Sequence, residues 1–163
     1  MVDPNQPSAP FGGADDGRRL ELTIDSSLDH LSLITSALQG ICEDLGFDQE
    51  GSLEIELCAV EALTNAIVHG YCGESGHRVR LTVDTAGGEL QLRIVDAGHA
   101  IPPKARRRPP GPAFDPEDLA SVPNHGRGLF LIHHLMDRVE IRRHTDRNEI
   151  LLIRALPTGI RGS

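Results

Sequence analysis

Residues 61–71 read EALTNAIVHGY and place one asparagine, Asn65, inside an apolar segment with helical spacing. Asparagine is a poor helix former because its amide competes for backbone hydrogen bonds, so alanine or leucine would be favoured there. Residues four apart are neighbours on a helix, and Glu61, Asn65 and His69 therefore form one polar ladder. This ladder is either a solvated face or a site whose oxygens could bind a hydrated Mg²⁺ and orient water.

The sequence around this segment predicts an α+β domain. Residues 20–25 alternate as a strand, residues 26–46 repeat apolar side chains as a helix from Leu28 to Leu45, and residues 49–68 form a second helix. We expect this second helix to bury Leu53, Leu57, Val60 and Ile67, with Glu54 and Cys58 on its polar stripe. A hairpin follows over residues 79–94, then a long loop, a helix beginning at 126–128, and two closing strands. This order favours a two-layer α/β sandwich with helices on one face of a mixed, mostly antiparallel sheet.

Composition limits the function. The length suits one domain over residues 18–157, with flexible tails at 1–17 and 158–163. A net charge of −8 argues against nonspecific nucleic-acid binding, and the single lysine, Lys104, excludes a GxxxxGK[ST] phosphate loop. The three cysteines lack CxxC spacing, so neither a disulfide framework nor a zinc knuckle is expected. No apolar run is long enough to span a membrane, and we expect a soluble, cytoplasmic protein.

Two further groups of residues could carry chemistry. Asp96 and Gly98 stand at the end of the predicted hairpin, where an Asp-x-Gly pair commonly just turns the chain. Gly126, Gly128 and Leu129 open the third helix, whose bare amides and dipole suit an anion. Residues 99–125 lie between these groups, and a loop of this length is usually functional or disordered, so we expect a mobile lid.

Taken together, in this order, the phrases EALTNAIVHGY, VDAGHA and GRGLFLIHHLMD resemble the N, G1 and G2 boxes of one nucleotide-binding superfamily. It includes gyrase, the heat-shock chaperone of ninety kilodaltons, histidine kinases and the mismatch-repair ATPase. The first and third phrases are most similar to the stand-alone anti-sigma-factor serine/threonine kinases of bacterial partner-switching modules. The resemblance covers roughly residues 20–156 and implies a Bergerat-type ATP-binding fold.

The resemblance also implies a role for most of these residues, with ATP and Mg²⁺ as cofactors. Asn65 would coordinate Mg²⁺, and Glu61 would act as general base toward the attacking hydroxyl. Asp96 would accept a hydrogen bond from the adenine amino group, and Gly98 would let the base approach the backbone. Gly126, Gly128 and Leu129 form the far hinge of the lid, where the two glycines would offer amides to the phosphates. His69 lies where the ladder nears the nucleotide, and a capping or packing role for it is equally open.

The sequence departs from the family pattern at Ala100, which replaces the second glycine of Asp-x-Gly-x-Gly. Lys104 and the arginines at 106–108 could clamp the γ-phosphate, although a basic run is more often simply hydrated.

The implied partners are an antagonist protein as substrate and a sigma factor or another target, with a possible homodimer and neither nucleic acid nor membrane. One alternative is a module that binds nucleotide and sequesters a partner without turnover. Another is a histidine-kinase-type domain, which is disfavoured because no phospho-accepting helical hairpin precedes the domain. An α+β domain that binds no nucleotide is the third, and the joint occurrence of three boxes argues against it.

Overall fold

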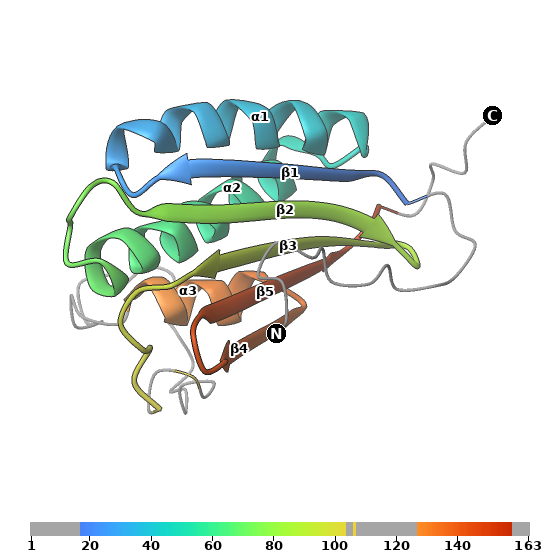
Figure 1. Ribbon diagram of the computed structural model, residues 1–163. Helices are drawn as coiled ribbons and strands as arrows, with labels where there is room; N and C mark the ends of the chain where they lie inside the picture. Colours follow the sequence, from blue (N-terminus) through green and yellow to red (C-terminus); the bar gives the residue numbers. More distant parts are fainter. Residues whose placement is uncertain (1–16, 104–105, 107–126, 158–163) are drawn as a thin grey trace.

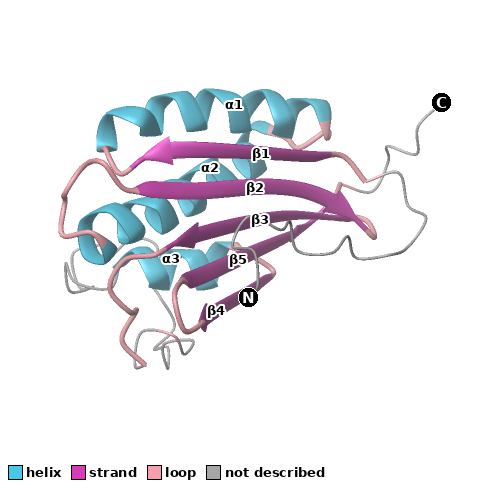
Figure 2. Cartoon of the chain, viewed as in Figure 1, coloured by secondary structure: helices cyan, strands magenta, loops and turns pink. Residues whose placement is uncertain are grey.

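A computed structural model describes residues 17–103, 106 and 127–157 and places them in two layers, with the helices gathered on one side of a sheet (Figures 1 and 2). The described strands are β1 (Arg19–Asp25), β2 (Arg78–Ala86), β3 (Glu89–Asp96), β4 (Arg138–Arg143) and β5 (Asn148–Ala155). The described helices are α1 (Leu31–Asp44), α2 (Gln49–Thr64) and α3 (Arg127–Leu135), with a 3₁₀ turn at Leu28–His30 before α1 and a π-helix at Asn65–Gly70 after α2. Both predicted tails, except Gly17, and most of the predicted lid lie outside the described residues.

The sheet has the strand order β1-β2-β3-β5-β4, and all four strand pairs are antiparallel. The α+β prediction is confirmed, while the described sheet is antiparallel throughout rather than mixed. The β2–β3 hairpin turns at Gly87 and Gly88, whose φ angles of 61° and 78° lie in the left-handed region that favours glycine. Because β5 lies between β3 and β4, the first residue of β5, Asn148, pairs with the last residue of β3, Asp96.

The core lies between the sheet and the helices. Alternate residues of β2, β3 and β5 face it, as the period of two predicts, and they include Leu81, Leu92 and Ile150. On the first helix, Ile34 and Leu38 are buried as expected, and the Ser27 side chain accepts a hydrogen bond from the Asp29 amide. Leu28 was expected in the core but is 50% exposed, because the chain begins this segment as a 3₁₀ turn that is out of phase with α1.

The buried face of α2 differs from the predicted one. Leu53 and Leu57 are 56% and 40% exposed, whereas Cys58, which was expected on the polar stripe, is fully buried. The buried side of α2 combines the small residues Cys58, Ala59 and Ala62 with Ile55 and Leu63. Ile67, in the π-helix that follows, is 1% exposed, as predicted. α2 packs against α1 on one flank and α3 on the other. The small side chains of its buried face let it lie close to the sheet. The Leu53–Leu57 stripe and the Ile55–Ala62 stripe both have three- and four-residue spacing. Packing of α2 against α1 and α3 buries the second of these stripes.

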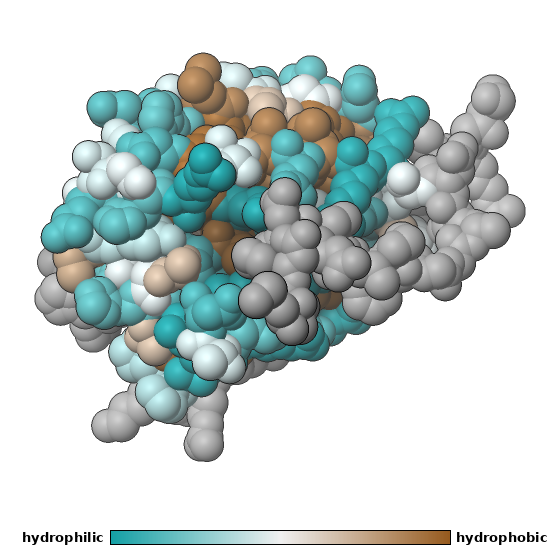
Figure 3. All heavy atoms as spheres, viewed as in Figure 1, coloured by the Kyte–Doolittle hydropathy of each residue, from teal (hydrophilic) through white to brown (hydrophobic). Residues whose placement is uncertain are grey.

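The surface toward the viewer in Figure 3 is mostly hydrophilic, with hydrophobic residues gathered over α1 and the edge strand β1. The exposed leucines of this part of the chain are Leu20, Leu28 and Leu33. Within the described residues, no helix is long and apolar enough to cross a membrane.

Candidate functional site

The end of α2 carries the polar ladder. Glu61 and Asn65 are both half-buried, whereas His69 is exposed. The helix changes from α to π at Asn65, whose backbone N–H donates to the carbonyls of both Ala62 and Glu61. Single turns of π-helix occur frequently at functional sites, because the wider turn breaks the regular stacking of side chains. The predicted ladder therefore spans two kinds of helix. Glu61 lies in α2, whereas Asn65 and His69 lie in the π-helix.

The π-helix ends against the segment that follows β3. A Cβ atom on Gly98 would lie 2.5 Å from both the carbonyl carbon and the carbonyl oxygen of Gly70, so no larger residue fits at position 98 without a backbone shift. The His99 amide donates to the Gly70 oxygen at 2.7 Å, and the Gly98 amide donates to Asp96 Oδ1 at 2.9 Å. The first and second predicted groups therefore meet at Gly70.

Asp96 is buried and is held by Asn148, which is 1% exposed. Asn148 Nδ2 donates to Asp96 Oδ1 at 2.8 Å and to the His99 carbonyl at 2.9 Å. Arg143 Nη1 donates to Asn148 Oδ1 and to the Gly98 carbonyl, each at 3.1 Å. Asn148 and the Gly98 amide both bind Oδ1 of Asp96, so neither of them occupies Oδ2.

Sequence reasoning missed Asn148 and Arg143. A signal was present, because Asn148 begins the buried alternation that continues with Ile150 and Leu152 and is the polar member of that stripe. Its partner could not be identified without the strand order. Tyr71 was missed as well: its hydroxyl donates to the Arg78 carbonyl at 3.1 Å and accepts from the Ala97 amide at 2.7 Å. Burial raises the pKa of Tyr71, so the phenol stays protonated and keeps both bonds.

The third predicted group meets the first at Glu61. A Cβ atom on Gly128, in the first turn of α3, would collide with the Glu61 carboxylate, so glycine lets the two approach. Leu129 packs against the hydrophobic core, which leaves its backbone as the part that could contact a ligand. Gly126 lies outside the described residues, as do Lys104, Arg107 and Arg108.

The described start of the predicted lid is bonded to its own surroundings. Arg106 Nε donates to the Ile101 carbonyl at 2.8 Å, and the Ile101 amide donates to Asn148 Oδ1 at 3.4 Å. Ala100, the departure from the glycine pattern, is exposed and directly precedes Ile101. The segment that follows Gly98 is therefore fixed through the same asparagine that holds Asp96.

Asn65 meets a structural test for binding a cation. Its Nδ2 is buried and has no hydrogen-bond partner among the described residues. Burying a polar atom without a partner is costly, and a half-turn of the amide exchanges its nitrogen and oxygen ends. A carbonyl-type oxygen is a ligand that Mg²⁺ accepts, and the residues present therefore fit this ion.

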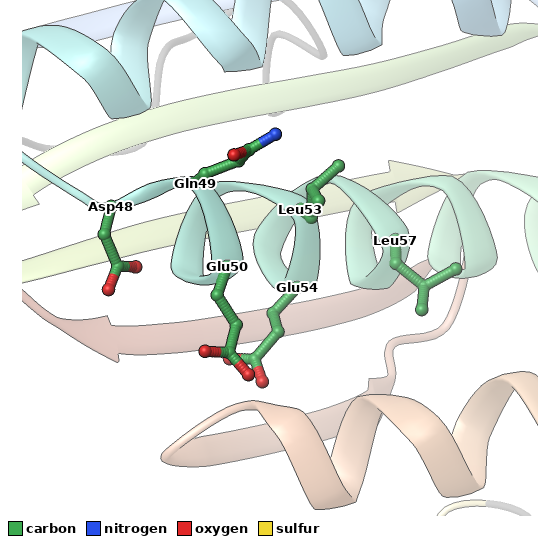
Figure 4. A pocket seen from close by; sticks show the side chains of 6 residues that line it. All are labelled: Asp48, Gln49, Glu50, Leu53, Glu54 and Leu57. Atoms are coloured by element: carbon green, nitrogen blue, oxygen red, sulfur yellow. The ribbon is translucent and has the colours of Figure 1, made fainter.

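A hollow of about 540 Å³ lies elsewhere, beside the first half of α2 (Figure 4). Its lining consists of Asp48, Gln49, Glu50, Leu53, Glu54 and Leu57. None of the predicted site residues belongs to it. The candidate site therefore lies outside this hollow, where Glu61 contacts the Gly128 segment and Gly70 contacts the Asp96–Gly98 segment.

The antiparallel sheet, its single helical layer and the three converging segments together define an ATPase-type α+β sandwich. Residues 24–154 match the family described as the histidine kinase-like ATPase domain, and the chain belongs to this family. The serine-protein kinase RsbW of Listeria innocua is 28% identical over 123 residues, which are 76% of this chain and 78% of the relative. The protein of the same name from Halalkalibacterium halodurans is 26% identical, with coverages of 76% and 75%.

The crystal structure of the RsbU and RsbW domains of Rv1364c from Mycobacterium tuberculosis superposes with a TM-score of 0.61 and 18% identity. The match covers 85% of this chain, which spans 32% of that longer chain, and it supports the fold alone. These comparisons confirm the predicted resemblance to the stand-alone serine kinases of the superfamily, and the name of the relatives agrees with the predicted enzyme class.

Proposed function

We propose that the protein is an ATP- and Mg²⁺-dependent serine/threonine protein kinase and an anti-sigma factor of a bacterial partner-switching module. Its substrate would be a small antagonist protein, and its second partner a sigma factor or another regulator of transcription. The observation that carries the proposal is the contact of Glu61 with Gly128 at one end of the site, while Gly70, at the end of the same helical segment, contacts the Asp96–Gly98 segment. Two segments that are distant in sequence therefore contact the two ends of one helical stretch, residues 61–70.

The position of Asp96 supports adenine binding. Two donors bind its Oδ1, and no donor from the described part of the chain binds Oδ2, which would accept from the exocyclic amino group of adenine. Gly98 has no side chain between the base and the backbone. At the other end of the site, amides of the first turn of α3, with Gly128 among them, would donate to the phosphates, because a helix N-terminus attracts anions. Gly126, Leu129 and His69 remain proposed contacts on the basis of family resemblance.

Glu61 would accept the proton of the substrate hydroxyl as that oxygen attacks the γ-phosphorus. The bond from the γ-phosphorus to the β–γ bridging oxygen then breaks, ADP leaves, and the new phosphoester remains on the serine or threonine. Asn65 would hold Mg²⁺, which supplies charge neutralisation for the phosphates when bound. The contact between Glu61 and Gly128 would keep the carboxylate close to the phosphate-binding turn.

The proposed partners act in the bacterial cytoplasm, and the proposal therefore assigns the protein to that compartment. A homodimer is part of the proposal on family analogy alone.

Replacing Glu61 by glutamine tests the kinase proposal. The test uses ATP labelled in its γ-phosphate, together with an antagonist captured from the source organism and identified by phosphopeptide mass spectrometry. Glu61→Gln should lower phosphotransfer by about 10²-fold or more, because general-base catalysis is worth about that much, and should leave nucleotide affinity almost unchanged. Glu43→Gln, an exposed change on α1, is the matched control and should behave as wild type.

Two results would contradict the proposal. If Glu61→Gln transfers phosphate at the wild-type rate, Glu61 is not the base. If the wild type binds ATP and captures a partner but transfers no phosphate to it, the protein is a nucleotide-binding sequestering module.

A further inference from the structure

The first two helices carry acidic side chains and no basic ones. From residue 31 to residue 64, across α1, the connecting turn and α2, the chain contains no lysine or arginine. The same segment contains seven acidic residues, which are Glu43, Asp44, Asp48, Glu50, Glu54, Glu56 and Glu61. A polar surface that served only solubility would mix both signs, because mixed charges avoid self-repulsion. α1, α2 and the turn between them therefore present a negative field to a partner.

Two large apolar side chains lie within this acidic surface. Leu53 and Leu57 are one helical turn apart on α2, and with 56% and 40% exposure they line the hollow of about 540 Å³. Figure 4 shows Leu53 pointing toward the side of α1, and Leu57 pointing, like Glu50 and Glu54, toward the side of α3. The lining of the hollow therefore combines two leucines with three acidic residues, Asp48, Glu50 and Glu54.

The local structure explains only part of this arrangement. Asp48 caps α2, since its Oδ1 accepts a hydrogen bond from the Gly51 amide at 2.8 Å. Glu54 pairs with Arg154 of β5 at 2.6 Å, which keeps that carboxylate at the rim of the hollow. Neither contact covers Leu53 or Leu57. Exposed apolar groups rimmed by charge are typical of protein interaction sites.

We propose that this surface, formed by Asp48, Glu50, Leu53, Glu54 and Leu57, docks a basic amphipathic helix of a partner protein. Such a helix would place two apolar side chains against the leucines, at a spacing of three or four residues, and lysine or arginine beside the carboxylates. Charge complementarity selects this occupant, since Asp48 and Glu50 form no ion pair among the described residues and only Glu54 is paired with a base, Arg154. The proposal does not depend on nucleotide binding, because none of the candidate nucleotide-site residues lines the hollow.

The test uses the full chain and a fluorescent helical peptide with leucines on one face and lysines elsewhere, in a titration followed by fluorescence anisotropy. The double variant Leu53→Gln with Leu57→Gln should weaken binding by about tenfold or more, because both leucines lose apolar contact. Glu50→Gln should weaken binding and reduce its salt dependence. All these positions are partly or largely exposed, so thermal unfolding should stay at the wild-type temperature.

Matched controls make the result specific. Leu33→Gln changes a leucine of α1 that is 67% exposed but lies outside the hollow, and Glu74→Gln changes an exposed acid in the loop before β2. Both should bind the peptide as wild type does. A scrambled peptide of the same composition, with its leucines spread around the helix, should bind at least about tenfold more weakly.

The proposal is wrong if the double variant binds as tightly as wild type, or if the scrambled peptide binds as tightly as the amphipathic one. It is also wrong if analytical ultracentrifugation shows an oligomer of wild type that the double variant converts to a monomer, because a second copy of the chain would then occupy the surface. ATP titration of the same variants separates this outcome from a failure of the nucleotide site, which these substitutions should leave intact.

Discussion

Gly98→Ala should destabilise the protein strongly although it adds only a methyl group. The new Cβ would lie 2.5 Å from the carbonyl carbon and oxygen of Gly70, about 1 Å inside the usual contact distance of carbon atoms. Both neighbours are backbone atoms and cannot rotate away. The shift would strain the bonds from His99 N to Gly70 O, at 2.7 Å, and from Gly98 N to Asp96 Oδ1, at 2.9 Å.

Overpacking costs about 1–3 kcal/mol and each of the two weakened hydrogen bonds about 0.5–1.5 kcal/mol, so we expect a loss of about 2–6 kcal/mol in the free energy of unfolding. A loss of this size is a large fraction of the stability of a typical domain. Nucleotide affinity should fall as well, because the shifted segment carries Asp96.

Urea denaturation followed by circular dichroism measures this change. The matched control is Gly40→Ala in α1, where a Cβ atom meets nothing within 4 Å. This control should be stabilised by about 1 kcal/mol, because alanine is the better helix former. A Gly98→Ala protein that unfolds within about 0.5 kcal/mol of wild type, the range of harmless surface changes, would refute the inferred contact with Gly70.

Gly128→Ala should leave stability near wild type, because the flexible Glu61 side chain can move aside. It should lower the phosphotransfer rate by about tenfold or more, because the Glu61 carboxylate is displaced. An unchanged rate would contradict the contact between Gly128 and Glu61. Arg143→Ala should weaken ATP and ADP binding about tenfold by freeing the segment after β3, and the neighbouring exposed change Arg142→Ala should not, as calorimetry would show. Burial raises the pKa of Cys58 to about 12, so above the ordinary thiol value of about 9 the unfolded chain releases a proton that the folded chain keeps. Below about pH 9 this thiol contributes fully to the free energy of unfolding. As the pH rises toward 12 that contribution is lost, at up to about 1.4 kcal/mol per pH unit. Urea titrations at alkaline pH should show that Cys58→Ala removes this part of the pH dependence of stability.

Much of the fold could be predicted from residue periodicity, because each element has a clear repeat. The β2–β3 hairpin and the succession of helices and strands along the chain follow from local sequence. The face of α2 did not, because two stripes of that helix have the same spacing and contact with both α1 and α3 decides between them. Leu53 and Leu57 were consequently assigned to the core, although they are exposed.

Some residues of the candidate site could likewise be predicted from local sequence, and others could not. Glu61, Asp96 and Gly128 could be found because each stands in a recognisable local phrase, and the structure brings their segments together. Asn148 and Arg143 carry no such phrase. Their importance arises from the pairing of β3 with β5, which sets Asn148 opposite Asp96, and strand order depends on packing of the whole chain rather than on a local pattern.

We propose that Asn65 and Asp96 belong to one Mg²⁺-dependent nucleotide site. Calorimetric titration of ATP and ADP into wild type and into Asn65→Ala, each with and without Mg²⁺, measures whether they do. We expect wild type to bind both nucleotides more tightly with Mg²⁺, and Asn65→Ala to lose the Mg²⁺-dependent part of the affinity while remaining folded. A folded wild type that binds neither nucleotide, or an Asn65→Ala protein with the same Mg²⁺ dependence as wild type, would contradict the claim.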